Sequence, residues 1–193
     1  MNEAVEIKVL KEFSTILDTL KIQYAIGGSI ASSVYGQVRF TQDADVMVVP
    51  FFSKSSQFYE CVKNLFYISK AAMSHALQSK TSFNIIHLET AFKIDIFVSK
   101  STPYDCQILS RAATIPLGHT DQDKFRFVSP EDIVLLKLVW YEQGQRVSEK
   151  QWNDILGVIA TQQRNLDYNY LEYWAKMLQV QKLLVKAINE CVS

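Results

Sequence analysis

The sequence is poor in cysteine, proline, glycine and histidine, and it has no excess charge of either sign. Its 193 residues include 3 cysteines, 4 prolines, 6 glycines and 3 histidines, and its 20 basic side chains are balanced by 20 acidic ones. Proteins that coat DNA through its phosphates show a strong basic excess, so the balance argues against that class, although it permits a local basic patch. With so few prolines, no Pro-rich linker divides the chain, and we find no internal repeat or low-complexity tract.

The three cysteines, Cys61, Cys106 and Cys191, are odd in number and far apart, and their spacing matches no metal site. Together with the lack of a signal peptide, this pattern predicts reduced thiols and a cytoplasmic protein. No apolar run approaches the length of a membrane span, so we expect no membrane partner. The oligomeric state stays open.

Hydrophobic residues make up 48% of the chain, enough for a proper core in one globular unit. They recur at helical and at strand spacing, which suits one globular α/β or α+β unit. Of these we expect the α+β fold, with a small mixed β-sheet flanked by helices. We expect the sheet domain over residues 1–128 and a C-terminal helical subdomain, packed beside it, over residues 129–193.

Short apolar runs that end at turn residues predict strands at 24–26, 43–49, 67–69, 83–88, 92–98, 108–109 and 125–127. Helical spacing and capping residues predict helices at 2–20, 30–35, 53–66, 130–141, 149–159, 168–178 and 180–191. The strands at 83–88 and 92–98 form an antiparallel hairpin, the rest of 101–128 is irregular, and 70–81 is either a helix or irregular. Gly36 is placed just past its helix, where a positive φ is common.

The first stretch with chemical content is Gly27-Gly28-Ser29, which follows one strand and opens a helix. Glycines let a ligand approach the backbone closely, and the first turn of a helix offers N–H groups to an anion. The stretch predicts a seat for phosphates. The plainer alternative is a simple turn.

Asp43 and Asp45 open the next strand, where residues two apart point to the same side at a spacing of about 7 Å. Neighbouring carboxylates repel each other unless a cation lies between them, and Mg²⁺ commonly binds one or two carboxylates together with substrate phosphates. The pair predicts a metal site. The alternative is two solvated residues at the start of a strand.

Asp95 lies in the middle of an apolar strand, on the same face as Lys93 and Phe97. An acid in such a strand is costly unless it is paired or bound to a metal. Asp95 is therefore a candidate metal ligand. The alternative is an ion pair with Lys93 or another cation.

The run GGS at 27–29, followed by DAD at 43–45, resembles the signature of the nucleotidyltransferase superfamily, which shares the DNA polymerase β palm. The run GQVRFTQDAD at 36–45 is similar to the small stand-alone bacterial branch, which includes abortive-infection toxins and antibiotic adenylyltransferases. The hairpin FNIIHLETAFKIDIFV and the tail from residue 129 extend the resemblance over nearly the whole chain.

This resemblance implies that Gly28 and Ser29 hold the β- and γ-phosphates of a nucleoside triphosphate. It also implies that Asp43, Asp45 and Asp95 bind two Mg²⁺ ions, for which Mn²⁺ can substitute. The superfamily requires a third carboxylate on a later strand, which matches the place of Asp95.

Two basic residues are further candidates for nucleotide binding. Arg39 belongs to the motif of the branch, and Lys137 lies inside an apolar helix. A lysine in such a place either extends to the edge of the helix or meets a buried anion, such as the triphosphate. Asp154, on the following helix, is another candidate partner for Lys137. The lone histidine His87 is expected to be structural or half-exposed.

The function expected from these features is a metal-dependent nucleotidyltransferase. An acceptor hydroxyl would attack the α-phosphate of an NTP such as ATP, with release of pyrophosphate. Acceptors in the superfamily include tRNA ends, proteins and small molecules such as antibiotics. The alternative is a non-catalytic nucleotide-binding or interaction module, such as a toxin–antitoxin component. A phosphatase or nuclease ranks third, because it leaves the Gly-Gly-Ser turn unexplained.

Overall fold

A computed structural model describes residues 5–38, 41–117 and 123–192, and it confirms the α+β class. Its sheet has seven strands in the order β3-β4-β5-β2-β1-β7-β6. The pairs β2–β5 and β1–β7 are parallel and the other neighbours are antiparallel, so the sheet is mixed as predicted. Within the described ranges, no helix combines the length and the apolar character that a membrane span requires.

The strands are β1 (Tyr24–Ile26), β2 (Asp43–Val48), β3 (Phe66–Ile68), β4 (Ser82–His87), β5 (Lys93–Val98), β6 (Ala113–Pro116) and β7 (Lys124–Phe127). The helices are α1 (Val5–Thr19), α2 (Gly28–Tyr35), α3 (Ser55–Val62), α4 (Lys70–Ser79), α5 (Pro103–Arg111), α6 (Pro130–Gln143), α7 (Glu149–Gln162), α8 (Tyr168–Met177) and α9 (Gln181–Val192). Short 3₁₀ turns lie at Phe52–Lys54 and Gln163–Asn165.

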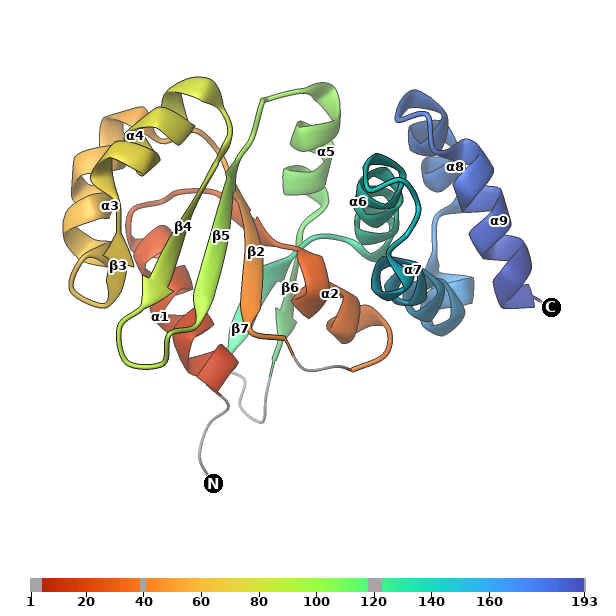
Figure 1. Ribbon diagram of the computed structural model, residues 1–193, viewed down its shortest axis with the longest axis horizontal. Helices are drawn as coiled ribbons and strands as arrows, with labels where there is room; N and C mark the ends of the chain where they lie inside the picture. Colours follow the sequence, from red (N-terminus) through yellow and green to blue (C-terminus); the bar gives the residue numbers. More distant parts are fainter. Residues whose placement is uncertain (1–4, 39–40, 118–122, 193) are drawn as a thin grey trace. The chain divides into compact units, whose positions relative to one another are not determined.

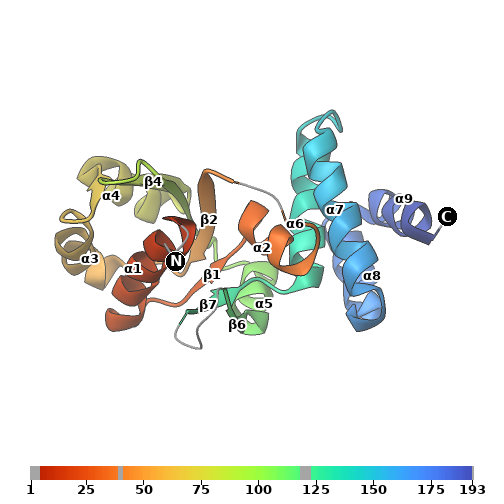
Figure 2. The same cartoon turned by 90° about the horizontal axis from the view of Figure 1, so that it is seen from below.

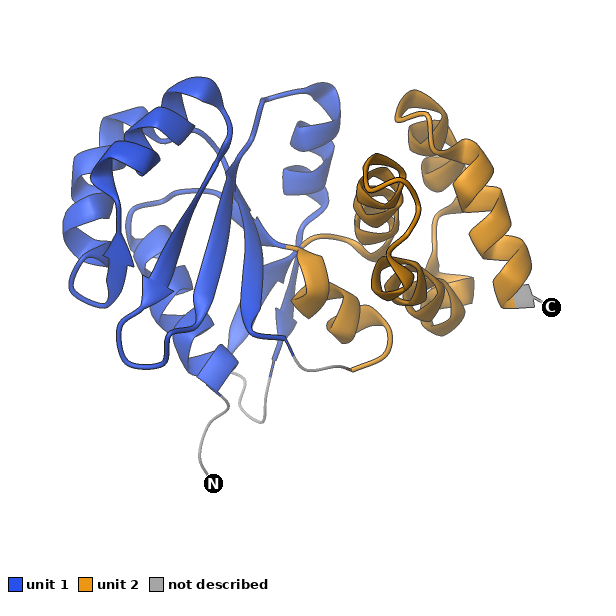
Figure 3. Ribbon diagram, viewed as in Figure 1, with its two compact units in different colours: residues 1–26, 41–127 blue, residues 27–40, 128–193 orange. Residues whose placement is uncertain are grey.

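The described residues form two compact units, which Figure 3 distinguishes by colour. Unit 1 comprises residues 1–26 and 41–127 and contains the sheet, whereas unit 2 comprises residues 27–40 and 128–193. Helix α2 therefore groups with the C-terminal helices rather than with the strands on either side of it. The division at residue 128 that we expected for the domains stays a prediction.

In unit 1, a core of phenylalanines lies on one face of the sheet. Helices α1, α3 and α4 gather on that side of the strands in both views (Figures 1 and 2). Phe13 of α1 meets Phe58 of α3 and Phe66 of β3 edge to face, and all three side chains are fully buried. Strands β2 and β5 alternate half-buried and buried residues, because successive side chains point to opposite faces. Their apolar half completes this core.

His87, at the end of β4, connects the sheet to α1 through a side-chain contact with Glu12. Its ring is buried, with Nε2 3.0 Å from Glu12 Oε2 and Nδ1 2.9 Å from Thr90 Oγ1. These contacts agree with the structural role expected for this histidine.

Three expectations about unit 1 need correction or completion. Ile108 and Leu109 belong to α5, not to a strand, because Thr102 accepts a hydrogen bond from the Asp105 N–H and Pro103 fits the first turn. The helix predicted to reach residue 66 ends at Val62, and the chain then enters β3. For residues 70–81 the sequence left a helix or an irregular segment as alternatives, and the structure has the helix α4 there. Ser69 caps this helix by accepting a hydrogen bond from the Ala72 N–H.

In unit 2, α6, α7 and α8 begin at the predicted caps. Ser129, Ser148 and Asp167 each accept a hydrogen bond from the backbone N–H three residues later. Such caps satisfy backbone donors that the first turn of a helix leaves without partners.

Gly36 follows the last residue of α2 as predicted, but the positive φ expected there is wrong, since its φ is −133°. Glycine is needed there for a close approach. A Cβ at Gly36 would lie 2.9 Å from the backbone of both Gly157 and Val158 in α7. The end of α2 therefore packs directly against the backbone of α7.

Candidate functional site

The three predicted aspartates lie on the face of the sheet opposite the phenylalanine core. Strands β2 and β5 are parallel neighbours, and their register pairs Asp45 with Asp95 and Asp43 with Lys93. All four residues occupy the half-buried positions of the two alternating strands. The fold thus brings together carboxylates that are separated by about fifty residues of sequence.

Lys93 and Asp95 form an ion pair, with Nζ 2.7 Å from Oδ2. The hydrogen bond to Asp95 raises the pKa of Lys93, the charges of Asp95, Asp43 and Asp45 raise it further, and partial burial opposes them. The ammonium therefore lies in the combined negative field of all three carboxylates. The ion pair that the sequence offered as the alternative for Asp95 is present.

The side chain of Asp43 is hydrogen-bonded to a residue just before its own strand. The buried hydroxyl of Thr41 donates a hydrogen bond of 2.7 Å to Asp43 Oδ1. This bond orients the carboxylate, because Thr41 is fixed by its own burial.

The donor set matches Mg²⁺ in kind, since carboxylate oxygens are the hard ligands that this ion prefers. Among the described residues, however, no three Asp, Glu, His or Cys side chains are arranged so that they could hold a metal ion. The Asp95 carboxylate faces Lys93 instead. A metal at these residues would compete with that ammonium and would require the side chains to turn toward it.

Sequence reasoning missed Asn84 on β4. The register of the hairpin places Asn84 directly opposite Asp95, and residues opposite each other in a sheet share a face. Asn84 is exposed and extends the row formed by Asp45 and Asp95. The alternation FNIIH and the hairpin length were the signals that could have identified it.

The Gly-Gly-Ser turn begins immediately after β1. Gly27 is the N-cap of α2 and supplies no side-chain cap, and Gly28 has a φ of 58°, a conformation that favours glycine. A helix start without a side-chain cap suits an anion, because the first N–H groups of a helix have no intrahelical acceptors. Phosphate binding by Gly27, Gly28 and Ser29 stays a prediction.

Lys137 is buried in α6, with 2% of its surface exposed. Its ammonium donates to Asp154 Oδ2 at 2.8 Å and to Gln151 Oε1 at 3.2 Å, so its buried anion is the carboxylate on α7. The predicted pairing with Asp154 is confirmed. A direct contact with the nucleotide stays a prediction that must compete with this pair, and Arg39 lies outside the described residues.

No family model matches the chain, and no curated protein matches it. Several solved structures are similar to it. An antigenic nucleotidyltransferase-like protein from Paracoccidioides brasiliensis is 20% identical, with a TM-score of 0.56 over 95% of this chain and 91% of that chain.

The antibiotic-resistance factor ANT(2″)-Ia, solved in solution, is 11% identical, with a TM-score of 0.60 over 98% of this chain and 99% of that chain. The same factor, crystallised in complex with adenylyl-2″-tobramycin, gives 11% identity and a TM-score of 0.59 over 91% of this chain and 98% of that chain. At these identities the likeness shows the fold. The nucleotidyltransferase fold predicted from the sequence is therefore confirmed.

Proposed function

We propose that the chain is a metal-dependent nucleotidyltransferase that transfers NMP from an NTP to an acceptor hydroxyl. The observation that carries the proposal is the register of Asp45 against Asp95, with Asp43 on the same face. Three half-buried carboxylates on one sheet face cost free energy unless cations neutralise them. The shared fold supports the same reaction class, since one of the related structures holds an adenylylated antibiotic.

In this proposal, Asp43 and Asp45 would hold the divalent cation that accompanies the triphosphate, and Asp95 would act on the acceptor side. Mg²⁺ or Mn²⁺ bound there would neutralise phosphate charge and lower the pKa of the acceptor hydroxyl. The acceptor oxygen forms a bond to the α-phosphorus while the bond to pyrophosphate breaks, and the hydroxyl proton passes to the Asp95 carboxylate. Asn84, beside Asp95, orients the acceptor by hydrogen bonding.

The N–H groups at the start of α2 bind the β- and γ-phosphates through Gly27, Gly28 and Ser29, as the resemblance implies. Arg39 is included on the resemblance alone. Lys137 is kept as a candidate for nucleotide binding, where it would act together with its ion-pair partner Asp154. The acceptor class, whether protein, tRNA or small molecule, is left open.

The test incubates the pure protein with each labelled NTP, Mg²⁺ or Mn²⁺ and a cell lysate, and follows label in protein, RNA and small molecules. Asp95→Asn should reduce transfer by several orders of magnitude, because the acceptor oxygen is no longer positioned or made acidic. It should leave most of the thermal stabilisation by NTP and Mg²⁺. Asp18→Asn, an exposed change on α1, is the matched control and should transfer as wild type does.

The second candidate is a non-catalytic nucleotide-binding or interaction module, such as a toxin–antitoxin component. The Lys93–Asp95 pair favours it, because a resident ammonium already neutralises the third carboxylate. The same assay separates the two functions. Stabilisation by NTP without transfer to any lysate fraction would select the module, and Asp95→Asn transferring at the wild-type rate would refute the catalytic assignment.

A further inference from the structure

Lys93 places a positive charge beside the three aspartates of the sheet. It precedes Asp95 by two residues on β5, so the two side chains share a face, and its Nζ lies 2.7 Å from Asp95 Oδ2. The register of β5 against β2 puts Lys93 opposite Asp43 and Asp95 opposite Asp45. One ammonium and three carboxylates therefore form a single patch across two parallel strands.

All three carboxylates act on this ammonium. The hydrogen bond to Asp95 and the charges of Asp95, Asp43 and Asp45 each raise the pKa of Lys93, while partial burial opposes them. A metal ion that is to interact with the same three carboxylates must bind in the same region. Lys93 and a divalent ion at Asp95 are therefore competitors for one position.

The arrangement suits one divalent ion better than two. Paired catalytic ions lie about 3.5–4 Å apart, so a second ion on Asp95 would lie close to the ammonium that already contacts this carboxylate. Within the ranges that the structure describes, no three acidic, histidine or cysteine side chains surround a common metal position. One ion on Asp43 and Asp45 remains feasible, because Mg²⁺ often binds one or two carboxylates together with substrate phosphates.

The charges of the patch also balance with one ion. The three carboxylates carry three negative charges, which one divalent ion and the Lys93 ammonium neutralise together. A second divalent ion would add positive charge to a patch that is already neutral, beside an ammonium of like charge. Such repulsion is stronger in a partly buried site than in water.

The ammonium of Lys93 is able to meet a substrate. A lysine carries three N–H donors, of which the contact with Asp95 occupies one, and 41% of the side chain of Lys93 is exposed. The remaining donors can point to an oxygen of the acceptor. A cation at that distance favours the ionised form of a hydroxyl, which is the effect that a metal ion has there.

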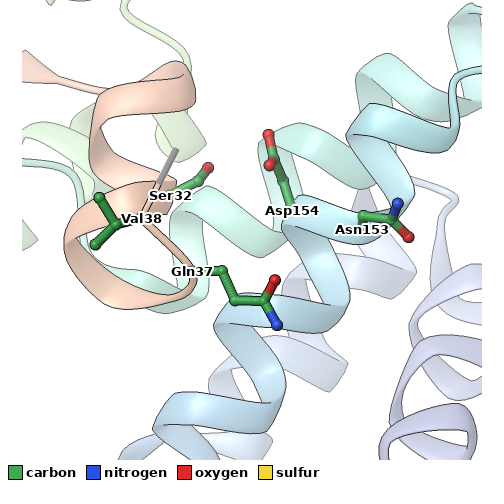
Figure 4. Close-up of a pocket in the computed structure, with 5 residues that line it drawn as sticks. All are labelled: Ser32, Gln37, Val38, Asn153 and Asp154. Atoms are coloured by element: carbon green, nitrogen blue, oxygen red, sulfur yellow. The ribbon is translucent and has the colours of Figure 1, made fainter. Parts of the chain in front are cut away.

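Lys137, the other lysine paired with a carboxylate on a neighbouring element, does not have this freedom. Its side chain is 2% exposed, and its ammonium donates to Asp154 at 2.8 Å and to Gln151 at 3.2 Å. Asp154 in turn lines a small pocket between α2 and α7, together with Ser32, Gln37, Val38 and Asn153 (Figure 4). Lys137 is thus committed to the packing of two helices, whereas Lys93 faces solvent at the carboxylates.

We infer that Lys93 takes the place of an acceptor-side metal ion, so that the site binds one divalent cation and uses the ammonium as its second cation. The inference rests on the proposed function, because it gives Lys93 a role in the same transfer. The acceptor oxygen bonds to the α-phosphorus, the bond from the α-phosphorus to pyrophosphate breaks, and the hydroxyl proton passes to Asp95. Lys93 keeps its protons and stabilises the negative charge that develops on the acceptor oxygen.

Counting bound Mn²⁺ tests the inference without any nucleotide. The full chain is titrated with Mn²⁺, and EPR spectroscopy measures both the free ion and the magnetic coupling between bound ions. Wild type should saturate at one uncoupled ion per chain. Lys93→Gln should bind two coupled ions, because the second position no longer holds a positive charge. Two coupled ions in wild type, or fewer than two in Lys93→Gln, would overturn the inference.

Two control variants separate charge from structure. Lys93→Arg keeps the positive charge and should keep the single ion of wild type. Lys100→Gln removes an exposed lysine just past the end of β5 and should also bind one ion. A merely structural role for Lys93 would give the same number of bound ions in wild type and in every variant.

The dependence of NMP transfer on metal concentration is a second measurement. At low Mn²⁺ the rate should be first order in Mn²⁺ in wild type and second order in Lys93→Gln, because the variant needs a second ion. The variant should be at least about tenfold slower under these conditions, since a hydrogen bond from a charged donor is worth roughly that factor. Excess Mn²⁺ should restore its rate, and a first-order dependence in Lys93→Gln would contradict the inference.

The failures of the two proposals are distinguishable. If NMP is transferred and wild type binds two coupled ions, the role of Lys93 is refuted and the proposed function stands. If wild type binds one ion and Lys93→Gln binds two, but no NTP is ever used for transfer, the position of the ammonium is upheld and the catalytic proposal fails.

Discussion

Lys93 and Asp95 lie two residues apart on β5, and their side chains form an ion pair of 2.7 Å on a face where Asp43 and Asp45 also lie. Both side chains are partly exposed, at 41% for Lys93 and 24% for Asp95. The strand thus carries its own cation beside the third carboxylate. Any metal that binds Asp95 meets a competitor of like charge.

Removing that cation should strengthen metal binding. In Lys93→Gln, the three aspartates lose their resident positive charge, so Mn²⁺ should bind at least about fivefold more tightly in the absence of nucleotide. Calorimetric titration with Mn²⁺ measures this affinity. Lys100→Gln, just past the end of β5, serves as the control, and weaker or equal binding by Lys93→Gln would mean that the aspartates do not form a metal site.

Asn84 should contribute to binding of the acceptor and not to binding of the nucleotide. Once an acceptor is identified, Asn84→Ala should raise the KM for that acceptor about two- to tenfold, since one hydrogen bond is worth about 0.5–1.5 kcal/mol. The thermal shift produced by NTP and Mg²⁺ should stay at the wild-type value. A change in that shift with the acceptor KM unaltered would place Asn84 on the nucleotide side.

The buried pair of Lys137 and Asp154 should couple strongly in stability. Lys137→Met leaves a carboxylate without its cation and should cost about 3–5 kcal/mol in the free energy of unfolding. Adding Asp154→Leu should recover much of that loss, because the uncompensated charge is gone. Urea denaturation of the two single variants and the double variant gives the coupling, with Lys150→Met on the exposed side of α7 as the control.

Tyr35 should make stability depend on alkaline pH. Burial, followed by the charges of Glu131 and Asp132, raises the pKa of Tyr35 from 10.0 to about 12. The folded chain therefore holds the phenolic proton more tightly than the unfolded chain does. The stabilisation is complete below about pH 10 and is lost as the pH rises toward 12.

Tyr35→Phe tests this dependence. The Tyr35 hydroxyl is buried and has no hydrogen-bond partner among the described residues, so its removal should leave stability unchanged or increase it. The difference in melting temperature between Tyr35→Phe and wild type should widen in favour of the variant between pH 10 and 12. A constant difference across that range would show that Tyr35 does not titrate with folding.

Local physics in the sequence determined most of the elements and the chemical content of the candidate site. Period-two alternation in KIDIFV fixed which residues of β5 share the face of Asp95, because a strand has no other periodicity. The serines at 129 and 148 fixed the starts of two helices, since capping depends on groups only three residues apart. The Gly-Gly-Ser turn and the two clustered aspartates were likewise recognisable as a pattern within one short stretch.

The tertiary structure decided what depends on residues far apart in the chain. It paired Asp45 with Asp95 and added Asn84 to their row. It also selected, among the partners that the sequence left open, Asp154 on α7 for Lys137. It also explained Gly36 by the approach of α7, where local reasoning had predicted a positive φ. Strand register and helix packing arise from contacts between distant segments, and no local propensity encodes which side chains those contacts will bring together.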